Sequence, residues 1–204
     1  MKMKILWLGI FCIVLMWSGI NPKDQYTWFL EVLPAIIGLF VLGITYNSFR
    51  LTTLTYTLIL IHCIILMIGG HYTYAEVPLF DYIKDVFELD RNNYDKVGHF
   101  VQGFVPAIIT KEIFIRKNII VSNGWQNFLV ICVCLAFSAF YELIEWWVAL
   151  YSGQNAEAFL GTQGYIWDTQ SDMALALIGA ICAIVFFSEV LNKQIQYLKS
   201  DFKF

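Results

Sequence analysis

Charged side chains are scarce in this sequence of 204 residues. Asp, Glu, Lys and Arg together make up 14% of it, whereas 59% is hydrophobic and 17% is Phe, Trp or Tyr. The mean hydropathy of +0.64 lies well outside the usual range of soluble globular proteins. These proportions argue against an ordinary water-soluble domain and predict a protein whose solvent is the lipid bilayer.

Several sequence patterns that would identify a function are also missing. All five cysteines fall in apolar runs, where cysteine acts as a small apolar residue, so they indicate neither a disulfide framework nor a zinc site. There is no HExxH motif, nucleophile elbow or glycine-rich phosphate loop. No basic patch suggests nucleic acid as a partner. Without a linker, repeat or low-complexity tract, we expect a single membrane domain over residues 1–204.

Six apolar runs are present, and most are close to the roughly 20 residues that cross a hydrocarbon core of about 30 Å. They predict an all-α polytopic membrane protein with about six transmembrane helices. The expected spans are 4–20, 28–46, 51–70, 97–115, 127–149 and 172–190. The first run follows Lys2 and Lys4, as a signal peptide would, but no small-x-small cleavage site comes after it. We therefore expect an uncleaved anchor.

The distribution of Lys and Arg predicts the orientation in the membrane. With the N-terminus inside, nine of the 13 basic residues fall in cytoplasmic segments and four fall outside. We therefore expect both termini in the cytoplasm. The outer loop 71–96 is too long for a simple turn, and its interleaved apolar and charged residues predict a short interfacial helix. The other long outer loop, about 151–171, is rich in amide and hydroxyl side chains, which suits ligand binding.

Ionisable side chains inside the expected spans stand out, because a charged group at mid-depth in lipid costs about 2.5–3.5 kcal/mol. They occur at i, i+4 and i+7 spacings that place each set on one helix face. The three sets are Asp95, His99 and Gln102; Ser138, Glu142 and Glu145; and Asp168 and Asp172. In the expected topology all three lie toward the outer leaflet, so they predict an outward-facing polar cleft built from residues 69–183.

Small residues accompany the last of these sets. Ala176, Gly179, Ala180 and Ala183 continue close to the face of Asp172, so this side of the helix can approach a neighbouring helix closely. The two aspartates of that helix then point into the bundle.

One histidine with up to four carboxylates could bind a divalent cation, which could activate water against a phosphoester or polarise a lipid head group. Without metal, His99 could act as a general base while Lys96 and Arg91 steady a phosphate. The expected catalytic residues are His99, Glu142, Glu145, Asp95 and Asp172. The expected metal ligands are His99, Glu142, Glu145 and Asp172. The expected substrate-binding residues are His71, Arg91, Lys96, Gln102, Gln163, Asp168 and Gln170.

A cleft at this depth suits membrane lipids as partners, with a phospholipid head group or a lipid-linked envelope intermediate as substrate. The corresponding enzyme would be a hydrolase or a transferase.

Two other classes of function stay open. Intramembrane acids and a histidine also make proton relays and cation sites in transporters, although only His62 and Thr110 extend the polar residues toward the cytoplasmic half. A non-catalytic scaffold could use the same residues as a hydrogen-bonded network, at about 0.6 kcal/mol per interhelical bond. The sequence does not indicate an oligomeric state.

Three segments carry a family resemblance: RNNYDKVGHFVQGFVPA, SAFYELIEWW and FLGTQGYIWDTQSDM. They resemble the signature segments of the YjdF-like family of bacterial inner-membrane proteins, a domain of unknown function, over roughly residues 69–183. More loosely, they resemble the VanZ-like membrane proteins, in which an Asp-Lys-x-x-His motif precedes an acid on a helix and an Asp before a small-residue helix.

This resemblance implies a multi-pass protein of the bacterial inner membrane, and it supplies no established reaction. In the family pattern an acid often stands at the position of Tyr165 and an aromatic residue at that of Ser171, which argues against either as a general catalytic residue. The positions that match the family motifs are Asp95, Lys96, His99, Glu142, Glu145, Asp168 and Asp172.

Overall fold

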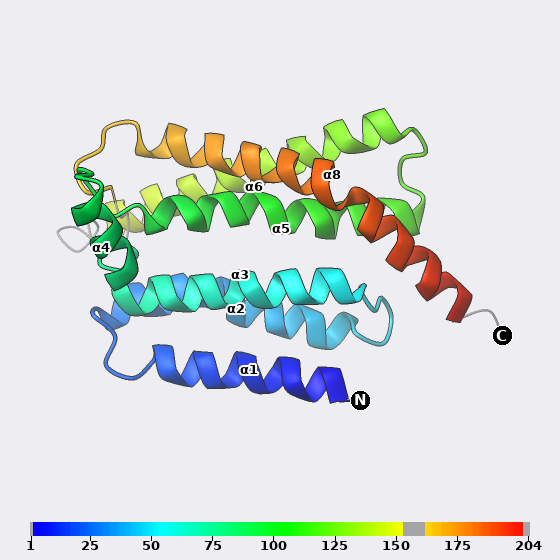
Figure 1. Cartoon of the computed structure of the whole chain (residues 1–204), viewed down its shortest axis with the longest axis horizontal. Helices are drawn as coiled ribbons and strands as arrows, with labels where there is room; N and C mark the ends of the chain where they lie inside the picture. Colours follow the sequence, from blue (N-terminus) through cyan, green and yellow to red (C-terminus); the bar gives the residue numbers. More distant parts are fainter. Residues whose placement is uncertain (1, 153–161, 202–204) are drawn as a thin grey trace.

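The computed structural model describes residues 2–152 and 162–201, and all regular secondary structure in these ranges is helical (Figure 1). The all-α prediction is therefore confirmed. Part of the loop expected at 151–171 lies outside the described residues. The helices are α1 (Lys2–Ser18), α2 (Gln25–Thr45), α3 (Thr53–Tyr72), α4 (Pro78–Val86), α5 (Tyr94–Lys117), α6 (Asn123–Ser152) and α8 (Asp168–Asp201).

Each expected span coincides with a long helix, and α4 is the short helix expected within residues 71–96. Among the described residues, α2, α3, α6 and α8 are long and apolar enough to cross a membrane, and α1 is apolar but shorter. The 24 residues of α5 are long enough to cross, but its charged and polar residues make it less apolar. The expected count of six spans is consistent with this arrangement.

The long helices lie roughly side by side, with α4 across one end of the bundle (Figure 1). Helices α1, α2 and α3 form one group, and α5, α6 and α8 form the other. The two groups meet mainly where α3 packs on α5. The beginning of α1 and the end of α8 lie toward the opposite end from α4 (Figure 1).

The most extensive helix pair is α5 with α8, and glycine makes it possible. A Cβ atom on Gly103 of α5 would overlap the backbone of Ala176, and one on Gly179 of α8 would overlap the carbonyl oxygen of Phe100. Ala180 and Ala183 are completely buried in the same interface. The predicted close approach of the small-residue face of α8 is confirmed. Since Asp172 lies one turn before Ala176, this contact directs Asp172 toward α5.

A fully buried carboxylate organises the end of the bundle away from α4. Glu112 of α5 is 0% exposed and accepts hydrogen bonds from the Thr52 backbone N–H at 2.9 Å and the Thr52 hydroxyl at 3.0 Å. The Thr55 hydroxyl donates at 2.5 Å and the Arg116 guanidinium at 2.8 Å. With both oxygens bonded, this carboxylate fastens the start of α3 to α5. Because its hydrogen-bonding capacity is met within the protein, we assign Glu112 a structural role.

The N-terminus of α2 is capped by a side chain in the preceding loop. The Asp24 carboxylate accepts a hydrogen bond from the backbone N–H of Thr27 at 2.6 Å, and this bond lowers the pKa of Asp24 below its usual value. A nearby exposed ion pair joins Lys23 to Glu76 at 2.6 Å and raises the pKa of Lys23. These contacts fix the loop that carries the chain from α1 into α2, and with it the position of Glu31 one turn further along.

Replacing Gly103 with leucine should destabilise the protein, because the new side chain cannot fit against the backbone of α8. Overpacking of this kind costs about 1–3 kcal/mol and more where backbone must move. Thermal unfolding of the purified protein in detergent measures the effect. The matched control is Gly38→Leu on α2, since a Cβ on Gly38 meets no atom within 4 Å. Equal stability of the two variants would contradict the packing described here.

Candidate functional site

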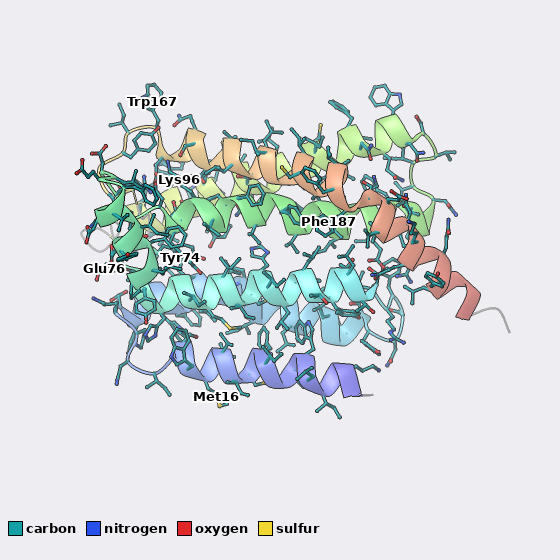
Figure 2. The ribbon with its side chains drawn as sticks, viewed as in Figure 1. Met16, Tyr74, Glu76, Lys96, Trp167 and Phe187 are labelled. Carbon is teal, nitrogen blue, oxygen red and sulfur yellow. The ribbon has the colours of Figure 1, made fainter. Side chains whose placement is uncertain are left out.

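The three polar sets of the sequence meet at the end of the bundle near α4. His99 lies on the second turn of α5, Glu142 and Glu145 near the end of α6, and Asp172 on the second turn of α8. Figure 2 shows Tyr74 between the two helix groups at this end, with Lys96 nearby. Side chains from three helices therefore converge on one point.

Acceptor groups face both nitrogens of the His99 ring. Asp95 Oδ1 lies 3.3 Å and Asp172 Oδ2 lies 3.9 Å from Nε2. On the other side, Gln102 Oε1 lies 3.2 Å and Glu142 Oε1 lies 3.8 Å from Nδ1. A neutral imidazole has a single N–H, so it cannot donate to both sides. The arrangement calls for an imidazolium, for a protonated carboxyl group, for a Gln102 amide turned so that its NH2 donates to Nδ1, or for a bound cation.

These groups are shielded from solvent and only partly satisfied. His99 is 6% exposed, Asp172 is 2% exposed and Glu142 is 9% exposed. Among the described residues, neither Glu142 Oε1 nor Asp95 Oδ2 has a hydrogen-bond partner, although both atoms are buried. Ser138 Oγ, one turn before Glu142 on α6, is likewise buried without a hydrogen-bond partner in the described part of the chain. Buried acceptors without partners are costly, which distinguishes this cluster from the fully bonded Glu112.

Two overlapping sets of residues have the spacing of metal ligands, with donor atoms within 4.8 Å of one another. The first is Asp95, His99 and Asp172, and the second is His99, Glu142 and Glu145. Ligands that lie about 2.0–2.6 Å from a cation are at most about 5 Å apart, so either set could surround one ion. The two sets use the same imidazole. Nitrogen combined with carboxylate oxygen suits zinc or manganese better than a soft metal.

Arg91 connects the start of α5 with the segment that leads into α8. Its guanidinium is hydrogen-bonded to the Asp168 carboxylate and donates to the carbonyl oxygen of Thr162 at 3.1 Å. A second nitrogen lies 3.6 Å from Asp95 Oδ2. All three charged side chains are buried. Arg91 therefore holds Asp95 and Asp168 on neighbouring helices in fixed positions beside His99.

An amide pair reinforces this connection. The Asn92 backbone N–H donates to Gln163 Oε1 at 3.0 Å, and the Gln163 amide donates back to the Asn92 carbonyl oxygen at 2.8 Å. The Asn92 side chain donates in turn to the Val77 carbonyl oxygen at 3.0 Å and to Asp81 at 2.9 Å. Gln163 thus fixes the segment before α8, and α4 is tied to the start of α5.

Some residues predicted to bind substrate lie at the edge of the cluster or apart from it. The Lys96 ammonium lies 5.2 Å from the centre of the Tyr165 ring. Gln170 is exposed on the first turn of α8. His71 is placed elsewhere: its Nδ1 lies 2.9 Å from the carbonyl oxygen of Ser18, and its ring stacks on Trp17 with 4.7 Å between centroids. It covers the end of α1 and lies apart from the cluster around His99.

Glu31 belongs to the site, although the sequence reasoning gave it no role. It is buried on α2 and lines a cavity of about 440 Å³ together with Asp95, His99 and Glu145. Its approach depends on Gly70, because a Cβ there would lie 3.2 Å from the Cβ of Glu31. The available signal was a lone acid within an otherwise apolar helix.

Aromatic residues close the same cavity near its polar end. Tyr74 and Tyr141 both line it. The Tyr74 ring lies where a Cβ of Gly69 would be, and it is 3.0 Å from the position of a Cβ on Gly98. These glycines therefore create the space that the Tyr74 ring fills between α3 and α5.

Together, the apolar helices and the buried histidine–carboxylate cluster define a helical membrane protein with an ionisable cluster at one end of its bundle. The model of the family described as "Predicted membrane protein (DUF2238)" matches residues 3–193. The chain belongs to this family.

A curated relative supports this assignment. The chain is 49% identical to the "Inner membrane protein YjdF" of Escherichia coli (strain K12) over 184 residues, which cover 90% of this chain and 88% of that protein. No solved structure matches significantly. The predicted YjdF-like membership is confirmed, and the looser resemblance to VanZ-like proteins stays a prediction.

Replacing Arg91 with alanine should loosen the segment before α8, because Asp168 and the Thr162 carbonyl lose a charged hydrogen-bond donor. Bonds to charged groups contribute about 1.5–3 kcal/mol each. Hydrogen–deuterium exchange should be faster over residues 162–172 than in the unaltered protein. The control is Lys84→Ala, which removes an exposed ion pair with Asp81 at 3.8 Å. Unchanged exchange in the Arg91 variant would show that this segment is held by other contacts.

Proposed function

We propose that the protein is an enzyme of the bacterial inner membrane that acts on the head group of a membrane lipid or a lipid-linked envelope intermediate. His99 and its surrounding carboxylates form the reacting centre. One observation carries this proposal: the His99 ring has carboxylates facing both of its nitrogens. Two oxygens of these carboxylates, Asp95 Oδ2 and Glu142 Oε1, are buried and have no hydrogen-bond partner among the described residues. A purely structural cluster would be expected to satisfy these atoms, as the Glu112 cluster does.

The donor set fits a divalent cation. Either Asp95 and Asp172, or Glu142 and Glu145, would complete a nitrogen-and-oxygen set with His99. A bound cation would satisfy Glu142 Oε1, which has no hydrogen-bond partner among the described residues, and would supply a Lewis acid for a phosphoryl or carbonyl oxygen, or a water of lowered pKa. His99 would take the central place in this set, and Arg91 would keep Asp95 in position for it.

A lipid head group in the cavity would contact those residues of the His99 cluster that line the cavity. Asp95, His99, Gln102 and Glu145 line the cavity, whereas Glu142 and Asp172 are not part of its lining. Glu145 is therefore placed to accept a proton from a water or a hydroxyl at the head group. Gln102, whose carbonyl oxygen faces His99, can orient that ring. Glu142 and Asp172 face the His99 ring from outside the cavity and would hold that ring in place.

A phosphate on the substrate would not be held by Arg91 in the way the sequence suggests, because its guanidinium is bonded to Asp168 and Thr162. Lys96 remains the cation at the rim, where it lies near Tyr165. Similarity to an inner-membrane protein of E. coli supports the membrane assignment. The excess of Lys and Arg in one set of loops supports cytoplasmic termini, which would place the cluster near the outer face.

Cation binding or transport is a second candidate function, and one observation favours it. The cavity that starts at Asp95 and His99 also touches His62 and Thr110, deeper in the bundle. Intramembrane histidines and acids of this kind serve proton and cation pathways in transporters.

Substitution of the centre should remove activity without removing the protein. We expect His99→Ala and Glu142→Gln to insert into the membrane at normal levels and yet to fail to complement any phenotype of a gene deletion. The reason is that both residues contribute ligands or proton acceptors to the centre. The matched control is Glu189→Gln, an exposed glutamate on α8 paired with Lys193 at 3.1 Å. Loss of both site variants from the membrane, with the control retained, would favour the scaffold function.

Metal analysis separates the forms of the proposal. Protein purified in mild detergent should contain about one divalent cation per chain, and Asp172→Asn should reduce its affinity at least tenfold, in line with losses of metal ligands and their supports. Protein that stays active after chelation would rule out the metal form and leave His99 as a general base. Cation flux into proteoliposomes, abolished by His62→Ala, would favour transport instead.

A further inference from the structure

We propose that the cavity beside His99 is a groove for one hydrocarbon chain of an aminophospholipid, whose ammonium-bearing head group lies against the carboxylates at its polar end. This inference rests on the proposed function and specifies its substrate class. It is carried by the shape of the cavity, by the division of its lining into a polar and an apolar part, and by the charge of the polar part.

The cavity is long and lies between the two groups of helices. Its walls come from α2 and α3 on one side and from α5 and α6 on the other. Along α5 it extends from Asp95 to Ile113, which corresponds to about 27 Å at 1.5 Å per residue. That length approaches the roughly 30 Å of a bilayer hydrocarbon core. Its volume of about 440 Å³ falls within the range of ligand pockets.

The lining changes character along this length. The polar end holds Glu31, Asp95, His99, Gln102 and Glu145. The rest of the wall is formed mainly by Pro34, Leu66, Pro106, Ile109, Ile113 and Phe137. A molecule complementary to both parts has a polar head and a long apolar tail. In a protein that lies in a bilayer, a lipid has this form.

A continuous file of water fits the apolar part less well. A buried water needs two to four polar partners, and a cavity lined by aliphatic and aromatic side chains stays dry. Between Gln102 and Thr110 the α5 side of the cavity is formed by Pro106 and Ile109. His62 is the single polar side chain that α3 contributes to the described lining. An apolar chain fills this stretch without leaving polar groups unpaired.

The charge at the polar end selects the head group. Five carboxylates gather around His99: Glu31, Asp95, Glu142, Glu145 and Asp172. They outnumber the two positive charges that a divalent cation held by the neutral His99 ring would supply. Arg91 pairs with both Asp168 and Asp95, so its single positive charge balances no more than one of the carboxylates around it. An ammonium group adds positive charge and three hydrogen-bond donors, whereas an anionic head group without an amine would be repelled.

Photo-crosslinking in nanodiscs tests the groove. The full chain is reconstituted with phosphatidylethanolamine that carries a diazirine near the end of one acyl chain. After irradiation, peptide mass spectrometry should locate the label on residues of the apolar lining, such as Leu66, Ile109 and Phe137. Ile109→Trp and Ile113→Trp should each fill the groove and reduce this labelling at least fivefold. The control Ile178→Trp, at a half-exposed residue of α8, should leave it unchanged.

The outcomes distinguish this inference from the proposed function. The groove proposal would be wrong if labelling of the lining were undiminished in both groove variants, or if the label were confined to the outer surface of the bundle. The proposed enzymatic function would still be tested separately by metal content and complementation. If one groove variant fails to accumulate, the other decides. Groove labelling that persists in His99→Ala together with loss of complementation would support both.

The head-group part has a separate test. The same diazirine chain on phosphatidylglycerol should label the groove at least fivefold less than on phosphatidylethanolamine. Equal labelling would refute selection for the ammonium group, and labelling by a free diazirine fatty acid alone would assign the groove to fatty acids. Glu31→Gln should reduce the preference for phosphatidylethanolamine, because it replaces one of the carboxyl groups at the polar end of the groove.

Discussion

The site depends on the close contact of α5 with α8. Without a side chain at Gly103 or Gly179, the two backbones come near enough for Asp172 to face Nε2 of His99 at 3.9 Å. A bulkier residue at either position would move the acid away from the ring by roughly the width of a methyl group or more. Since interhelical packing in lipid relies on van der Waals contact more than on a hydrophobic force, such small residues carry much of the specificity.

The two ends of the bundle treat buried charge differently. At one end Glu112 receives four hydrogen bonds from backbone, hydroxyl and guanidinium donors. At the other end Glu142 and Asp95 each keep a buried oxygen without a hydrogen-bond partner among the described residues. The Glu112 cluster shows that this fold can provide a buried carboxylate with a full set of hydrogen bonds. In the described part of the chain, the His99 cluster lacks such a set. The cost at the His99 end is the kind that functional sites retain.

Much of this could be predicted from the sequence because its two strongest signals are local. Runs of apolar residues located the long helices, and spacings of four and three residues placed His99 with Asp95 and Glu142 with Glu145. The partners of Arg91 could not be deduced in this way, since its pairing with Asp168 joins positions 77 residues apart. Glu31 could not be assigned to the site from the sequence, because its inclusion depends on Gly70 allowing α2 to approach α3. His71 was misplaced because a residue just after a span can turn toward either neighbour.

The length of α8 has a mechanical consequence. Its 34 residues correspond to about 51 Å, which exceeds a hydrocarbon core of about 30 Å. One end carries Asp168 and Asp172, and the other lies further from them than one hydrocarbon core is thick. A helix is stiff along its axis, and an axial shift of those aspartates by an ångström moves the distant turns by about as much. A shift of Asp168 and Asp172 along the axis of α8 would therefore be carried to the far end of the helix.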